Sequence, residues 1–166
     1  MALRNIITKE EKSLRRPSRQ VVKFDDRLHT LLDDMRETLF QANGVGLAAP
    51  QVGVNRRVVI VTDENDEVIE LINPEVISAD GEQEGYEGCL SVPGFYGVVR
   101  RPMNVTVKAQ NRDGNEFTVS GEGLLARAFC HEIDHLDGRL YTDIVLGTLI
   151  TAEEMEAMMT EDGDEE

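Results

Sequence analysis

Two of the three histidines in this 166-residue chain lie four positions apart, in the stretch CHEIDHLDG at residues 130–138. Positions i and i+4 share one face of an α-helix, so His131 and His135 can bind one metal ion together. Glu132 lies about 100° round the helix from His131, which suits a general base acting on water better than a third ligand. The pattern H-E-x-x-H therefore indicates a metal-dependent hydrolase, although two histidines on a buried helix could also serve only as hydrogen-bonding groups.

A third ligand would decide what kind of site this is. The chain lacks the H-x-x-G-x-x-H pattern of the metzincins, but downstream acids such as Glu153 keep an acidic ligand possible. Of the two cysteines, Cys130 points roughly 100° away from His131 on a helix and suits a small core residue. Cys89 follows the strands in a glycine-containing stretch and could approach as a thiolate ligand for zinc or ferrous iron. Three protein ligands and one open position are typical of a catalytic site.

A glycine-rich stretch, GVGLAAPQVG at residues 44–53, could also take part in chemistry. It follows a predicted helix and precedes a predicted strand, which is the reverse of the order in a dinucleotide-binding fingerprint, and no G-x-x-x-x-G-K occurs in the chain. We therefore reject a phosphate-binding role. The glycines would instead let the backbone approach a substrate closely, and Gln51 could donate its amide N–H to a developing oxyanion.

The elements that must position these residues follow from the spacing of apolar residues. An N-terminal helix, capped by Asp25 or Asp26 and ended at Asn43, precedes the glycines, and a second helix from Gly123 to Leu136 carries the histidines. Strands are predicted at 56–62, 67–73, 74–80, 104–110 and 115–121, with a loop at 81–94 and a short final helix at 151–159. This order favours an α+β fold with antiparallel sheets in a single domain, 1–166, that ends in a disordered acidic tail from about residue 160.

The charge of the chain bears on its partners. The net charge is −15 and the isoelectric point is about 4.6, so a uniform field would repel DNA and anionic membranes. No apolar run approaches the roughly 20 residues needed to cross a bilayer, and the first twenty residues lack an apolar core of signal-peptide length. We expect a cytoplasmic monomer whose cysteines are reduced.

Three stretches in order resemble the signature motifs of the bacterial peptide deformylases: GVGLAAPQ at 44–51, EGCLS at 87–91 and HEIDH at 131–135. Their spacing also fits, and the resemblance covers nearly the whole chain. It implies antiparallel sheets that surround a central helix, and removal of the formyl group from the N-terminal formyl-methionine of newly made polypeptides, with release of formate. It also implies one divalent metal ion, with ferrous iron expected first and zinc, nickel or cobalt as alternatives.

The resemblance assigns roles to individual residues by motif match. It implies that Cys89, His131 and His135 bind the metal, that Glu132 is the general acid and base, and that Gln51 and the backbone N–H of Leu90 stabilise the oxyanion. It further implies a substrate-binding set composed of Gly44, Val45, Gly46, Glu87, Gly88, Leu124, Arg127 and Ala128. The last three precede His131 at helical spacings and would border the methionine pocket, although Arg127 could instead point to solvent. The stretch VVRRP, which contains Arg100, is interpreted as a solvated strand end.

Two departures from the family pattern matter. Cys130 stands where the family often has glutamine before the H-E pair, and a buried packing role would leave catalysis intact. Some relatives carry a basic C-terminal helix that contacts ribosomal RNA, whereas residues 152–166 here contain no lysine or arginine. We therefore expect at most a transient encounter with the ribosome, and none through this tail.

Two rival functions stay open at this point. One is an H-E-x-x-H metallopeptidase with an acidic third ligand, in which Cys89→Ala would leave metal binding intact. The other is a metal-stabilised module without catalysis, in which Glu132→Ala would have little effect.

Overall fold

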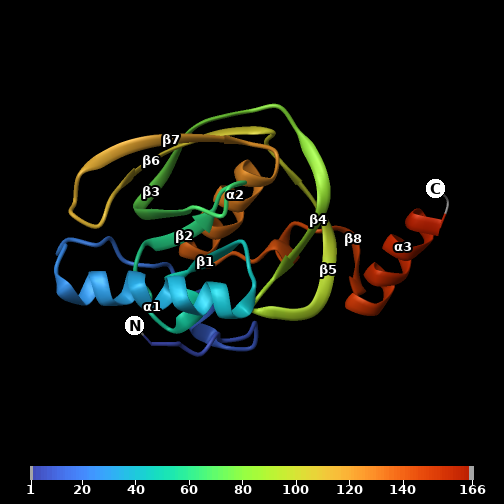
Figure 1. The fold of residues 1–166 in the computed structure, drawn as a ribbon, viewed down its shortest axis with the longest axis horizontal. Helices are drawn as coiled ribbons and strands as arrows, with labels where there is room; N and C mark the ends of the chain where they lie inside the picture. Colours follow the sequence, from blue (N-terminus) through green and yellow to red (C-terminus); the bar gives the residue numbers. More distant parts are fainter. Residues whose placement is uncertain (1, 165–166) are drawn as a thin grey trace.

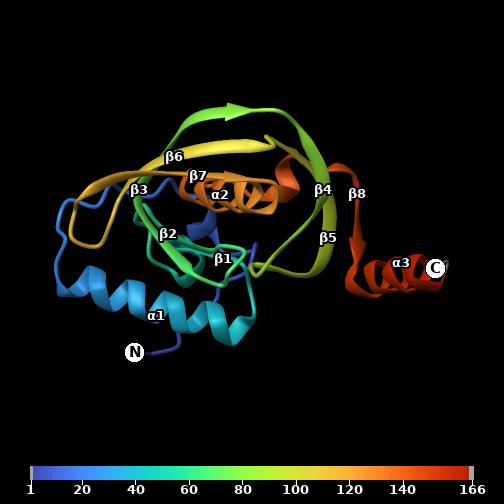
Figure 2. The ribbon, with the colours of Figure 1, turned by 45° about the horizontal axis from the view of Figure 1, so that its top comes forward.

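Helix α2 lies between two antiparallel sheets in the computed structural model, which describes residues 2–164 (Figures 1 and 2). The first sheet has the strand order β1-β2-β3-β6-β7, with bounds Gly46–Ala48, Val58–Thr62, Val68–Asp80, Asn104–Gln110 and Glu116–Glu122. The second has the order β4-β5-β8, with bounds Gln83–Cys89, Val92–Arg101 and Leu146–Thr151. The helices are α1 (Asp26–Ala42), α2 (Leu124–Leu136) and α3 (Ala152–Asp164), with 3-10 turns at Lys12–Arg15, Ala49–Val52 and Tyr141–Asp143. The α+β class and the central helix predicted from the sequence are confirmed.

Helix α1 forms where the sequence predicted it and covers the outside of the five-stranded sheet. The Asp25 carboxylate accepts the Leu28 N–H at 3.1 Å at the first turn, and Asn43 ends the helix in the left-handed region at φ 56°. Its buried apolar face packs against β2 and against Leu47 of β1. This packing holds the glycine-rich segment, which follows directly after the helix.

Helix α2 begins after Gly123, whose φ of +61° favours glycine, and buries its apolar face against the five-stranded sheet. Alternate residues of β6, Val105 and Val107, point into this core, as the period of two predicts. Cys130 packs against the edge of the same cluster. The other face of α2 thus carries His131 and His135 toward the second sheet.

Two parts of the strand prediction need correction. The predicted strands 67–73 and 74–80 form one long strand, β3, in which a register shift between Ile72 and Glu75 accommodates Pro74. Proline lacks a backbone N–H, so a bulge lets the strand continue past it. The predicted loop 81–94 is mostly strand: β4 runs to Cys89 and pairs with β5, leaving only a tight turn between them. The ligand candidate Cys89 is therefore fixed at a strand end.

The C-terminal part also differs from the prediction. Strand β8, which was not predicted, pairs with β5 through Tyr96 and Ile150. Helix α3 starts where Glu154 and Thr151 cap each other, and continues to Asp164, past residue 160, where we expected a disordered tail. Glutamate, alanine and methionine are strong helix formers and account for the predicted part of this helix, whereas the composition of residues 160–164 does not explain its extension. Residues 165 and 166 lie outside the described part. Among residues 2–164, no helix is both long and apolar enough to cross a membrane.

Asp34 of α1 should stabilise the fold by holding the N-terminal segment. Its nearly buried carboxylate accepts the Ala2 N–H at 2.8 Å and the Arg4 Nε–H at 3.0 Å. Burial alone would raise the pKa of Asp34, but the Ala2 and Arg4 hydrogen bonds outweigh it and lower the pKa below its ordinary value. We predict that Asp34→Asn costs about 1–3 kcal/mol of unfolding free energy at pH 7.

The pH dependence of this contribution follows from its sign. Because the folded pKa is lowered, the contribution is present above the unfolded pKa of about 3.9 and is lost as the pH falls through the folded pKa. Thermal unfolding of Asp34→Asn and of wild type should therefore differ most at neutral pH and converge in acid. Asp33→Asn, at a more exposed carboxylate, is the control; an equal effect of both variants would contradict this account.

Candidate metal centre and substrate pocket

Three ligand atoms converge where the end of β4 meets α2. Cys89 and the two histidines, His131 and His135, each offer a sulfur or a ring nitrogen, and these atoms lie within 4.8 Å of one another. The Cys89 Sγ is 3.4 Å from the His135 Nε2. Cys130 lies on another side of α2, so the structure brings together the set that the motifs implied and leaves Cys130 out.

The donor set fits a transition metal. One thiolate and two imidazoles suit zinc or ferrous iron, and three protein ligands leave a further position open. Within residues 2–164, the buried Glu132 Oε1 and His135 Nδ1 have no hydrogen-bond partner. Burial, with His131 nearby, lowers the pKa of His135 well below its ordinary value. Burial alone would also lower the pKa of His131, but Glu132, Cys89 and Glu87 raise it, so a metal ion would have to displace a proton from this ring on binding.

Glu132 lies beside this centre, and its carboxylate occupies space that is free because residue 46 has no side chain. A Cβ at residue 46 would come within 2.5 Å of the Glu132 Oε2, so only glycine leaves room for the carboxylate. Burial raises the pKa of Glu132 to about 7, although His131 opposes the shift. A bound cation would bring this pKa down. A carboxyl group poised near neutrality suits a residue that both takes and gives a proton.

Glu87 is the partner that fixes His131. The His131 Nδ1–H donates to the Glu87 Oε1 at 2.8 Å, which turns the Nε2 toward the ligand cluster. Arg101 donates to both Glu87 oxygens at 2.9 and 3.0 Å, and Arg127 Nη1 donates to the Oε2 at 2.8 Å. Burial alone would raise the pKa of Glu87, but the hydrogen bonds from His131 and Arg101 lower it to about 2. The group is therefore an anion at neutral pH.

These contacts revise two interpretations of the sequence and add to a third. Glu87 borders the pocket as expected, and both of its oxygens also accept hydrogen bonds from protein donors, among them the ring of His131. Arg127 does not point to solvent: its Nη1 also donates to the carbonyl oxygens of Val99 and Gly85. Of the two arginines in the VVRRP stretch only Arg100 is solvated, with a side chain that is 55% exposed, whereas that of Arg101 is 5% exposed. Sequence reasoning missed Arg101, although alternation along a strand must turn one of two adjacent arginines inward.

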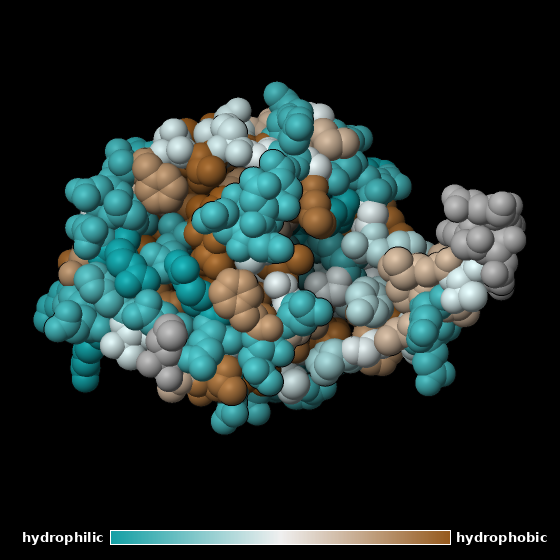
Figure 3. Space-filling model, in the orientation of Figure 1, coloured by the Kyte–Doolittle hydropathy of each residue, from teal (hydrophilic) through white to brown (hydrophobic). Residues whose placement is uncertain are grey.

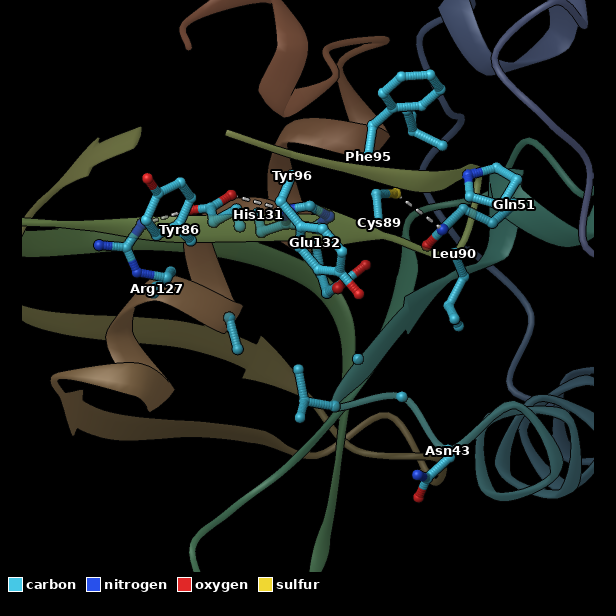
Figure 4. Close-up of a pocket in the computed structure, with 18 of the residues that line it drawn as sticks. Asn43, Gln51, Tyr86, Cys89, Leu90, Phe95, Tyr96, Arg127, His131 and Glu132 are labelled. Atoms are coloured by element: carbon cyan, nitrogen blue, oxygen red, sulfur yellow. Dashed lines mark hydrogen bonds and ion pairs between the residues drawn. The ribbon is translucent and has the colours of Figure 1, made fainter. Parts of the chain in front are cut away.

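Gln51 and His131 lie on opposite sides of Cys89 (Figure 4). Its Oε1 accepts the Ala48 N–H at 2.9 Å, and its Nε2 donates to the Ser91 Oγ at 3.1 Å and to the Cys89 Sγ at 3.5 Å. The amide orientation is thus fixed, with the donor side toward the metal ligand. Ser91 belongs to the motif EGCLS but was assigned no role, and it lies fully buried in the two-residue turn between β4 and β5.

A cavity of about 390 Å³ opens beside the ligand cluster (Figure 4). All eight residues of the predicted substrate-binding set line this cavity, together with Gln51, Cys89, Leu90, His131 and Glu132. Their contact with a substrate stays a prediction. The cavity is also lined by Phe95, Tyr96 and Tyr86, which the motifs did not indicate because they lie outside them.

Replacing Arg101 should damage both the fold and the metal centre. In Arg101→Met the Glu87 anion keeps fewer donors, and breaking a buried ion pair costs about 3–5 kcal/mol. Because Glu87 orients His131, metal affinity should also fall by roughly tenfold or more. Thermal unfolding and competition with a metal chelator would measure the two effects. Arg100→Met, at the neighbouring exposed arginine, should leave both quantities close to wild type, and an equal response would contradict the role of Glu87.

Comparison with known proteins agrees with this geometry. Residues 3–147 match the family model described as polypeptide deformylase. A peptide deformylase of Caldicellulosiruptor bescii is 56% identical over 156 residues, covering 94% of this chain and 93% of that protein. Another, of Acetivibrio thermocellus, is 55% identical and covers 94% of this chain and 91% of that protein.

Solved structures lead to the same family. A peptide deformylase from Legionella pneumophila superposes with a TM-score of 0.85 at 43% identity, covering 99% of this chain and 96% of that one. The enzyme from Thermotoga maritima gives a TM-score of 0.85 at 36% identity, covering 89% of this chain and 100% of that one. Sequence, fold and site together show that the chain belongs to the peptide deformylase family of hydrolases.

Proposed function

We propose that this deformylase is a metal-dependent amide hydrolase that acts on the N-terminal formyl-methionine of new polypeptides and releases formate. The observation that supports this most directly is the convergence of Cys89, His131 and His135 beside the buried carboxyl group of Glu132. Ferrous iron is the metal we propose, with zinc, nickel and cobalt as alternatives, because a thiolate and two imidazoles accept all four.

Different residues around the metal-ligand cluster would transfer the proton and stabilise the oxyanion. When bound, the divalent metal would polarise the formyl carbonyl and lower the pKa of water. Glu132 accepts a proton from the attacking water and delivers it to the departing amine nitrogen. Ala48 and Ser91 hold the Gln51 amide through its Oε1 and one Nε2–H, and the second Nε2–H, which points toward the Cys89 Sγ, donates to the oxyanion together with the backbone N–H of Leu90. Because the amide is oriented before substrate arrives, little reorganisation is needed during the reaction.

The cavity would bind the methionine and the peptide backbone. Leu124, Ala128 and the stem of Arg127 form the side of α2 that faces it, and an unbranched thioether side chain suits such an apolar wall. Gly46 lies against Glu132, so a substrate backbone bound there would place its scissile bond close to the base. We propose hydrogen bonds from the backbone of Gly44, Val45, Gly46 and Gly88 to the substrate.

We further propose that the protein acts as a cytoplasmic monomer that meets nascent chains without binding DNA or membranes. The final helix has no lysine or arginine, so any encounter with the ribosome would not use it to bind RNA.

The two cysteines test the ligand assignment. Cys89→Ala removes a metal ligand and should lose most bound metal after anaerobic loading with ferrous iron. Cys130→Ala is the matched control and should bind close to one metal ion per chain, because Cys130 packs against the core away from the cluster. Metal content per folded protein is the measurement. Full metal retention by Cys89→Ala would favour the rival metallopeptidase with an acidic ligand.

Formate release tests the reaction. The anaerobically purified, iron-loaded protein should release formate from a short formyl-methionyl peptide, and Glu132→Ala should lower kcat by at least about a hundredfold while keeping its metal. Glu116→Gln, at an exposed carboxylate of β7, should behave like wild type. Wild-type protein that holds metal but releases no formate would contradict the proposed function and favour a structural metal module.

A further inference from the structure

The three-stranded sheet has an outer face that continues from the catalytic cavity. On this face the cross-strand pairs are Tyr86 with Val98, Val98 with Leu146, and Tyr96 with Ile150. Paired residues of a sheet point to the same side, so these five side chains form one apolar surface, which we call the outer face. Tyr86 and Leu146 remain 39% and 40% exposed. The opposite side of the same strands carries the buried Glu87 and Val99.

Helix α3 forms a wall along the outer face. The Tyr86 hydroxyl lies 3.9 Å from the Met158 Sδ, so the middle of α3 contacts β4. Figure 1 shows that α3 follows β8 and stands beside the sheet rather than within the body of the protein. In Figure 3, pale brown atoms of intermediate hydropathy lie where this helix joins the body. Met158 is 40% exposed, so an apolar partner could still cover it.

The outer face and the cavity share two residues. Tyr86 and Tyr96 line the cavity together with Cys89 and Glu132. The Tyr96 ring also lies over Gly88, where an added Cβ would come within 2.6 Å of the ring. An extended chain that starts at Cys89 would need about 10 Å, or three residues, to reach Tyr86 along β4. A peptide that leaves the cavity in this direction therefore passes over the outer face.

The charge of the wall restricts which peptides fit. Residues 140–166 contain no lysine or arginine, and the first turns of α3 carry Glu153, Glu154 and Glu156. Glu84 lies beside Tyr86 on the same side of β4 and pairs with Arg100. Acidic side chains close to the helix would be repelled, whereas basic ones would be attracted.

We propose that the outer face and α3 bind the part of the substrate that follows the first three residues, with a preference for apolar and basic side chains. The inference rests on the proposed function and extends its binding site. The family model ends at residue 147, so most of β8 and all of α3 lie in a part of the chain that the model does not cover. The preference would therefore come from segments outside the three motifs.

Substrates of two lengths test the inference. The iron-loaded full chain would be assayed with formyl-Met-Ala-Ser, and with two longer peptides that add Leu-Leu-Lys or Leu-Leu-Glu. We expect kcat/KM to be roughly fivefold higher for the lysine peptide than for the tripeptide, mainly through KM, because partial burial of the two leucine side chains and attraction of the lysine to the acidic helix together supply a gain of this order. The glutamate peptide should lose most of this gain.

Two adjacent methionines give a matched pair of variants. Met158→Ser should bring the ratio of kcat/KM between the lysine peptide and the tripeptide close to one. Met159→Ser, one position further round the helix at 66% exposure, should keep the wild-type ratio. A wild-type ratio close to one, or equal ratios in the two variants, would overturn the inference while formate release from the tripeptide leaves the proposed function standing. No release from the tripeptide would contradict the proposed function itself.

Discussion

The ion-pair cluster around the buried Glu87 carboxylate connects the fold to the metal centre. The anion lies on β4, its donors Arg101 and Arg127 come from β5 and α2, and its third donor is the ring of His131. A buried charge is tolerated only when it is paired and hydrogen-bonded, so none of these elements can shift without leaving the anion short of donors. The three-stranded sheet and α2 are therefore held in register by the same contacts that orient a metal ligand.

The cluster extends beyond the carboxylate through Arg101. Its Nη1 donates to the Asp134 Oδ2 at 2.7 Å, on the turn of α2 between the two histidines. One guanidinium thus connects β4 and β5 to α2 just beside the ligands. Arginine suits this place because its planar fork can serve two carboxylates at fixed angles, which a lysine ammonium cannot do.

Most of the site could be predicted from the sequence because its residues obey local rules. The spacing of His131 and His135 fixes them on one helical face whatever surrounds the helix. Local patterns also predicted helix α1 and the hairpin of β6 and β7. The motif EGCLS indicated Cys89 as the third metal ligand. The carboxylate contacts of Arg101 and Arg127, and strand β8, could not be predicted in the same way. Whether an arginine meets a carboxylate or water depends on which strands become neighbours, and β8 exists only because β5 offers it an edge.

Two carboxyl groups that line the same cavity, Glu87 of β4 and Glu132 of α2, end with opposite properties because their surroundings differ. Glu87 has three charged or protonated donors, which keep its pKa at about 2. Glu132 has none for its Oε1 among the described residues, and burial raises its pKa to about 7. Because the two pKa values are far apart, Glu87 stays ionised at neutral pH while Glu132 can take up and release a proton. The unpaired carboxyl group costs folding free energy, and the fully paired Glu87 cluster beside it offsets part of that cost. If Glu132 were given a donor of its own, the fold would gain stability, but the carboxyl group would lose the basicity that proton transfer requires.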